Sequence, residues 1–458
     1  MLGLIEEGHA LLLKADFQSA ERCFNRAIAL DSACSMAHNN LGWTHERSGR
    51  LPEAVCSYRQ ALQVDPTLTL ARVNLASVLA RTGRQREALL LWESLIEERL
   101  FDRELLNEAI DAALAIGATP HAAKWADICG VMTRGRPHHP GGAQSVAVNR
   151  DLTPAMLRIE TLTHDIDQID YLRRSKVVDF DLDDMDRNYR HVRASLEASG
   201  DRRRRPLNDE EQSLIGATYG RIWHVRRTPA AGALPLWGEW DPSAIEESYR
   251  SSPLGLCVID NFLADEALSE VRRFCLQSTV WLANHYSHGR LGAFFREGFN
   301  CPLLLELAGQ FSQRLPHLIG DSHPLLQLWG FKYSPYQPTT HAHADFAAVN
   351  LNFWITPDEA NLQPSSGGLI VYDVEAPSNW EHNDYNRSGR QISAFLRNAG
   401  GRGVYIPYRA NRAVLFNSDL FHATAPLSFR SGYENRRINV TMLFGRRAED
   451  PKGPLRKR

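Results

Sequence analysis

Small and aromatic residues recur along about the first 130 positions with a period of 34 residues. The recurring positions in three successive copies are Gly8, Ala20, Phe24 and Ala27, then Gly42, Ala54, Tyr58 and Ala61, then Ala76, Ala88, Trp92 and Leu95. A fourth, weaker copy at about 103–129 holds Ala113 and Ala122. Small residues fit where two helices touch, and an aromatic residue fills the gap between neighbouring units. One helix pair has too little apolar surface to stand alone, so the pattern predicts stacked helix pairs.

The second copy carries a recognisable motif. Asn40-Leu41-Gly42 lies on its first helix, Ala54, Tyr58 and Ala61 follow, and Pro66 closes it. Over about residues 1–130 the chain thereby resembles the tetratricopeptide repeat family, an α-helical solenoid. The resemblance implies a concave groove for a peptide, a partner protein or another part of the same chain. Asn40 and Asn74 occupy equivalent positions, so they either line this groove and pair with a peptide backbone or are solvated helix residues.

Helix-breaking residues at 134–142 mark the end of the repeats, and His138 and His139 are interpreted as linker histidines. Beyond them, Thr153 followed by Pro154 predicts a helix start. Apolar residues at spacings of three and four predict two helices, one with Ile159, Leu162, Ile166, Ile169 and Leu172, the other with Met185, Tyr189, Val192 and Leu196. We therefore expect repeats at 1–133, a linker and helical bridge at 134–225, and a third domain at 226–458.

Composition, charge and cysteine content indicate which kinds of partner and which cellular location to expect. The 458 residues are 43% apolar and nearly balanced in charge (52 Lys and Arg, 54 Asp and Glu), which argues against disorder and against a nucleic-acid or membrane-surface partner. One basic run, 202–205, either contacts phosphate or forms a solvated loop, and the lack of interleaved aromatic residues favours the loop. Seven scattered cysteines without a CxxC pair, and a start without a secretory pattern, lead us to expect a cytoplasmic location.

The pattern changes at about residue 256. Short β-rich runs separated by turn-forming residues lie at 256–259, 327–333, 349–355, 368–372, 403–406, 412–416 and 437–444, and an amphipathic helix is expected at 264–275. Several short strands at this spacing predict a sandwich or barrel.

One histidine cluster in this region suggests a metal centre. His343 and Asp345 are two residues apart, so in an extended chain both side chains project to the same side. A later His422 supplies a third ligand, while His341 is a rival two residues upstream of His343. Two imidazoles and one carboxylate on one face of an octahedral ion leave positions open, which suits Fe(II) and oxygen chemistry. The alternative is a pair of polar loop histidines.

The last predicted strand follows His422 and presents alternating polar residues. Arg437, Asn439 and Thr441 fall on one face of this strand. An arginine there can grip the carboxylate of an anionic cosubstrate through two parallel hydrogen bonds. Arg436 remains an alternative anchor, and the alternation favours Arg437.

Together, His343-Ala-Asp345, His422 and Arg437 resemble the 2-oxoglutarate- and Fe(II)-dependent dioxygenases of the prolyl-hydroxylase-like branch, over about residues 255–446. The resemblance implies a double-stranded β-helix (jelly roll) with flanking helices. It implies iron ligation by His343, Asp345 and His422, binding of 2-oxoglutarate by Arg437 and Tyr333, and supporting contacts from Thr441 and Asn352. The cofactors would be Fe(II) and 2-oxoglutarate, with O2 as cosubstrate and ascorbate as a candidate reductant.

Two functions of different classes follow. In the first, the enzyme hydroxylates a C–H bond of a peptide, protein or carrier-bound substrate recruited by the repeats. In the second, the chain is a repeat-based adaptor whose oxygenase-like domain is catalytically silent. A small-molecule substrate, with repeats used for dimerisation, is a third possibility. The loop at 379–389 carries Trp380 and Tyr385, which are either lid residues or packing residues.

Overall fold

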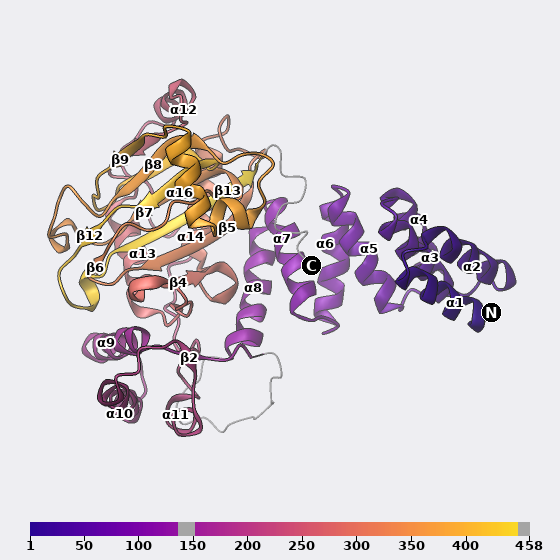
Figure 1. Ribbon diagram of the computed structural model, residues 1–458, viewed down its shortest axis with the longest axis horizontal. Coiled ribbons are helices and arrows are strands. Elements are labelled where there is room, and N and C mark those ends of the chain that lie inside the picture. Colours follow the sequence, from indigo (N-terminus) through magenta and orange to yellow (C-terminus); the bar gives the residue numbers. More distant parts are fainter. Residues whose placement is uncertain (136–151, 448–458) are drawn as a thin grey trace. The chain divides into compact units, whose positions relative to one another are not determined.

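The computed structural model describes residues 1–135 and 152–447, and it divides into two compact units, Met1–Trp125 and Ala126–Arg458 (Figure 1). The linker histidines His138 and His139 lie outside the described residues. Within the described ranges, no helix is both long and apolar enough to cross a membrane. The expected domain boundaries at 133 and 225 stay predictions.

The first unit is an array of antiparallel helix pairs, which confirms the predicted repeats. Its helices are α1 (Leu2–Leu13), α2 (Phe17–Leu30), α3 (Ser35–Arg47), α4 (Leu51–Val64), α5 (Thr69–Arg81), α6 (Gln85–Glu97) and α7 (Arg103–Ala115), and α8 (Thr119–Arg134) continues into the second unit. The aromatic positions of the three copies, Phe24, Tyr58 and Trp92, are fully buried.

A hydrogen-bonded chain of polar side chains links the first helices of three pairs. Asn40 on α3 pairs with His9 on α1 (2.8 Å between Nδ2 and Nε2), and Asn39 donates to Asn40. Asn74 on α5 in turn donates to Asn39 (3.1 Å). Asn40 is therefore a buried, engaged residue rather than a solvated one, and Asn74 is half-buried.

The second unit begins with helices α9 (Ile159–Ser175) and α10 (Asp183–Ser199), which confirms the two predicted stripes. All five apolar positions of the α9 stripe are buried. The predicted helix start at Thr153 and Pro154 is wrong, because the chain there leads into a short strand instead. Met156 and Leu157 pair with Arg205 and Pro206, so backbone hydrogen bonds to a distant segment outweigh the local helix-start pattern.

The rest of the second unit is rich in strands that form several sheets. The further helices are α11 (Asp209–Ile215), α12 (Pro242–Ser251), α13 (Asp265–Gln277), α14 (Pro302–Arg314), α15 (His382–Asn386) and α16 (Gly389–Asn398). The strands are β1 (Met156–Leu157), β2 (Arg205–Pro206), β3 (Cys257–Ile259), β4 (Leu291–Phe294), β5 (Leu325–Lys332), β6 (Tyr336–Gln337), β7 (Ala347–Trp354), β8 (Leu369–Glu375), β9 (Gly403–Ile406), β10 (Ala413–Asn417), β11 (Leu420–Thr424), β12 (Leu427–Ser428) and β13 (Ile438–Arg446). These bounds confirm the predicted strands to within about three residues.

The larger sheet has six strands in the order β3-β10-β7-β13-β5-β4, and a smaller one has the order β11-β8-β9. All pairings in both sheets are antiparallel. β13 lies between β7 and β5, with Thr441 opposite Asn352. The small sheet contributes β11 and the large sheet contributes β13, so the two carry His422 and the residues that follow Arg437.

Candidate metal centre

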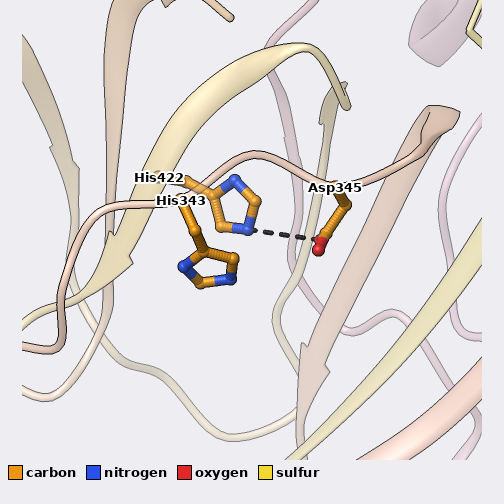
Figure 2. A group of neighbouring side chains, drawn as sticks. All are labelled: His343, Asp345 and His422. Carbon is orange, nitrogen blue, oxygen red and sulfur yellow. Dashed lines mark ion pairs between the residues drawn. The ribbon is translucent and has the colours of Figure 1, made fainter. Parts of the chain in front are cut away.

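The structure brings His343, Asp345 and His422 together. One potential ligand atom of each residue lies within 4.8 Å of the others. Nε2 of His422 is 3.4 Å from Oδ2 of Asp345, and the two imidazole centroids are 4.4 Å apart. Figure 2 shows the three side chains converging from two segments of the chain. Two imidazoles and one carboxylate thus face a common point.

Backbone pairing fixes this convergence. His343 and His422 form an isolated antiparallel bridge in which each backbone N–H donates to the carbonyl of the other residue (3.0 and 2.8 Å). Asp345 is tied to the turn before β11, because its N–H donates to the Ser418 carbonyl (3.3 Å). Residues about 80 positions apart are therefore held at one place by main-chain hydrogen bonds.

Neighbouring polar groups orient the three side chains. Nδ1 of His343 lies 3.3 Å from the His341 carbonyl, and Nδ1 of His422 lies 3.1 Å from the Leu420 carbonyl. A carbonyl can only accept, so each Nδ1 carries the proton and each Nε2 keeps a free lone pair for a metal. Asn350 on β7 donates to Oδ2 of Asp345 (2.7 Å) and so fixes the carboxylate.

The protonation states suit metal ligands. Burial, with a smaller contribution from the neighbouring His422, lowers the pKa of His343 to about 4, so its imidazole is neutral at physiological pH. Burial alone would raise the pKa of Asp345, but its close contacts with His422 and His343 and the hydrogen bond from Asn350 hold it below its ordinary value. Neutral imidazoles and an ionised carboxylate are the forms that bind metal.

Arg437 lies inside the same unit. It is 1% exposed, its Nε donates to the Gly367 carbonyl (2.7 Å), and its guanidinium carbon lies 4.6 Å from the centroid of the Tyr333 ring. Its Nη1 is buried without a hydrogen-bond partner among residues 1–135 and 152–447. Burial lowers the pKa of Arg437, so the environment disfavours an uncompensated guanidinium charge. An anion held by Nη1 would remove both deficits.

Arg436 points elsewhere. Its Nη2 lies 3.2 Å from Oδ2 of Asp167 on α9, so its charge already has a carboxylate partner. The geometry therefore favours Arg437 over Arg436, as the strand alternation does. His341 is exposed and does not belong to the three-residue cluster.

The other candidate residues form a polar network beside the cluster. Oδ1 of Asn352 accepts from Thr441 (2.7 Å) and from Asn439 (2.8 Å), and its amide donates to Asn350 (2.5 Å). The network therefore connects β13 to Asp345 through Asn350. The Tyr333 hydroxyl pairs with Thr424 (3.0 Å).

Some residues at the site carry no signal in the sequence pattern. Asn350 shares the alternation of β7 with Asn352, and only that alternation could have indicated it. The rings of Trp354, in the predicted strand 349–355, and of Tyr408, which no predicted element contains, lie near the Arg437 guanidinium. Trp380 packs on Phe395, and Tyr385 is buried, so both are packing residues in this structure.

Comparison with known proteins identifies the first unit. Residues 5–68 match the family model described as tetratricopeptide repeat. The N-terminal repeats are tetratricopeptide repeats. No curated protein matches the chain.

Solved structures similar to the chain are also repeat proteins. YrrB, described as a TPR protein with an unusual peptide-binding site, is 18% identical with a TM-score of 0.26, covering 27% of this chain and 64% of its own. A tetratricopeptide repeat protein from Parabacteroides merdae is 26% identical with a TM-score of 0.26, covering 27% and 50%. The first TPR of Spaghetti (RPAP3), solved with an HSP90 peptide, is 18% identical with a TM-score of 0.24, covering 24% and 89%. This chain therefore spans less than two thirds of the length of the first two.

Proposed function

We propose that the second unit is an Fe(II)- and 2-oxoglutarate-dependent dioxygenase that hydroxylates a C–H bond. The observation that carries the proposal is the convergence of His343, Asp345 and His422 within 4.8 Å, with their Nε2 and carboxylate atoms facing one another. A set of two imidazoles and one carboxylate leaves metal positions open, as oxygen chemistry requires. The antiparallel sheets support a double-stranded β-helix fold for this unit.

The residues present fit both groups that this chemistry needs. His343, Asp345 and His422 would hold Fe(II), and Arg437, with its unpartnered Nη1, would hold the distal carboxylate of 2-oxoglutarate. When bound, these groups and O2 supply the oxidising power for hydroxylation, with 2-oxoglutarate converted to succinate and CO2; ascorbate is the candidate reductant. The unpartnered Nη1 of Arg437 supports an anion site, and this observation does not depend on the metal cluster.

The chain itself contributes orientation and exclusion of water. Asn350 holds the Asp345 carboxylate in one orientation, and the backbone carbonyls fix the imidazole tautomers. The rings of Tyr333, Trp354 and Tyr408 surround the guanidinium of Arg437. These aromatic walls keep water from competing for its hydrogen bonds, which strengthens the grip on a carboxylate.

The tetratricopeptide repeats supply the second half of the proposal. Repeats of this type are interaction modules, and we propose that they recruit a peptide, protein or carrier-bound substrate. In the adaptor alternative they are the whole function, and the second unit is silent.

Measuring succinate formation with Fe(II), ascorbate and 2-oxoglutarate separates these two functions. We expect His343→Ala to lower the rate by on the order of 100-fold or more, because one of three ligands is lost. His341→Ala is the matched control, since this exposed histidine lies two residues away and outside the cluster. Equal rates in wild type and His343→Ala would defeat the catalytic proposal and leave the adaptor.

A further inference from the structure

A second feature of the Ala126–Arg458 unit is a cavity of about 390 Å³ beside the edge strand β4. Three arginines line it, namely Arg134, Arg204 and Arg296, and His285, Asn284 and Gln327 add polar groups. This volume falls within the range of small-ligand sites. The proposed metal and cosubstrate residues are not among its lining residues.

The charge in this cavity is unbalanced. Arg134 pairs with Glu297 through two contacts of 3.0 Å, and Glu297 is the only carboxylate among the lining residues that the structure describes. Arg204 donates its Nε to Oδ1 of Asn284 (3.0 Å) and has no carboxylate partner within the described ranges. Among the described lining residues, three arginines thus stand against one carboxylate.

The arginines of the basic run 202–205 differ in their partners. Arg203 and Arg205 both bind Asp201, and Arg205 also binds Glu211. Of Arg203, Arg204 and Arg205, only Arg204 lines the cavity, and within the described ranges no carboxylate pairs with it. Arg204 is exposed like Arg202 and Arg203, and its place in the cavity lining is what distinguishes it from them.

Aromatic contacts lead from this cavity to Tyr333. His285 in the cavity wall contacts Tyr286 (4.0 Å between centroids), and Tyr286 contacts Phe331 (5.0 Å), two residues before Tyr333. Arg290 lies over this track, with its guanidinium carbon 4.5 Å from the Tyr286 centroid and 5.8 Å from the Tyr333 centroid. Its Nε is buried and unpartnered among the described residues. Positive charge thus extends from the cavity toward the candidate centre.

We infer that this cavity binds an anionic group, a carboxylate or a phosphate, and that this group belongs to the substrate. The second half rests on the proposed function, and the first does not. Guanidinium groups bind carboxylates and phosphates through parallel hydrogen bonds, and an exposed acidic group would be drawn to the excess positive charge. An acidic group held here leaves the rest of the substrate to extend along the aromatic track toward His343.

Isothermal titration calorimetry of the full chain tests the site without reference to turnover. Hexaglutamate and inorganic phosphate are the two anionic probes, and hexaglutamine is the uncharged control. We expect Arg204→Glu to weaken binding of the anionic probe at least tenfold. Arg202→Glu is the matched control, because Arg202 belongs to the same run and is exposed like Arg204 but does not line the cavity; it should change affinity less than twofold. Arg204→Gln, which removes charge without reversing it, should give an intermediate loss.

The outcomes separate the two halves of the inference. Binding of hexaglutamate supports a carboxylate ligand, and binding of phosphate alone supports a phosphate ligand. Failure of both probes to bind, or equal losses in Arg204→Glu and Arg202→Glu, would overturn the site even where succinate still forms. Probe binding without any succinate formation would keep the anion site and overturn its role in substrate recognition.

Discussion

Arg436 and Arg437 are adjacent, yet the fold gives them opposite roles. The extended backbone sends successive side chains to opposite faces, so Arg436 meets Asp167 on α9 while Arg437 enters the sheet interior. These adjacent arginines in different environments, just before β13, make a controlled comparison possible.

We predict that Arg437→Lys raises the KM for 2-oxoglutarate about tenfold or more in the succinate assay. An ammonium is a point charge and cannot reproduce the two parallel hydrogen bonds of a guanidinium. Arg436→Lys, which keeps a charge beside Asp167, should leave KM within about twofold. A larger effect on KM at Arg436 than at Arg437 would show that Arg436, and not Arg437, binds 2-oxoglutarate.

Lys332 offers a test by pH. It is fully buried on β5, where its Nζ donates to the Cys275 carbonyl (3.2 Å) and the Tyr433 hydroxyl (2.8 Å). Burial holds its pKa well below the ordinary value of 10.5. The unfolded chain therefore binds more protons than the folded one between these two values, and stability rises with pH across that window.

Lys332→Met removes this dependence. We predict that the free energy of unfolding of wild type, minus that of Lys332→Met, increases as the pH is raised from 7 to 10, as measured by urea denaturation. Lys124→Met on α8, an exposed position, serves as the control and should leave the difference flat. A difference that falls with pH would show that the ammonium is stabilised, rather than penalised, by its surroundings.

The sequence predicts the candidate metal ligands better than it predicts the residues that surround them. His343 and Asp345 are two residues apart, and so are Arg437, Asn439 and Thr441. In an extended chain, residues at this spacing project to the same side, so the local sequence is enough to group them. Asn350, Arg290 and Tyr408 reach the site through tertiary packing, and a local pattern carries no information on which distant strands become neighbours. Arg204 shows the same limit, because its run looks like a solvated loop until Asn284 is placed beside it.

At the scale of elements, the repeat unit depends on close helix contact. A Cβ added at Gly42 on α3 would lie 2.6 Å from the ring of Tyr58 on α4, and one added at Gly8 would lie 2.7 Å from Phe24. These glycines let the aromatic ring pack against a helix backbone, which is why small and aromatic residues recur together.

We predict that Gly42→Ala destabilises the repeat unit by about 1–3 kcal/mol, because the extra methyl group meets a buried ring that has no room to move. Gly3→Ala on α1 is the matched control, since nothing lies within 4 Å of its added Cβ. There the gain in helix propensity should leave stability unchanged or raise it by about 0.5–1 kcal/mol. Thermal denaturation followed by circular dichroism measures the stability of both variants. Equal changes in stability would show that the close contact between Gly42 and Tyr58 does not determine the stability of the repeat unit.

The elements themselves follow from periodicity, but their connections do not. Short β-rich runs predict β7, β10 and β13 to within about two residues, and all three strands are almost entirely buried. The pairing of Met156–Leu157 with Arg205–Pro206 leaves no periodic pattern in the sequence, so the local pattern at Thr153 and Pro154 wrongly predicts a helix start. The order of strands in the six-stranded sheet is equally hidden, since β3 and β10 pair across more than 150 residues.

At the scale of the whole molecule, two compact units carry different chemistry on one chain. The repeats bury mainly small and aromatic residues, whereas the second unit buries His422, Asp345 and Arg437. Such buried polar groups cost stability unless a ligand compensates them. Ligand binding should therefore act on one unit and spare the other.

This difference yields the last prediction, made with Mn²⁺ in place of Fe(II) so that no turnover intervenes. At about 100 times its dissociation constant, a ligand that binds only the folded state adds about 2.7 kcal/mol of stability. We expect Mn²⁺ with 2-oxoglutarate to increase hydrogen-exchange protection of β7, β11 and β13, measured by mass spectrometry, and to leave α1 to α6 unchanged. Arg437→Lys should lose the part of this protection that depends on 2-oxoglutarate and keep the part that depends on Mn²⁺, because the guanidinium touches only the cosubstrate. Protection that appears equally in the repeats, or that survives intact in both Arg437→Lys and His343→Ala, would place the ligands somewhere other than this cluster.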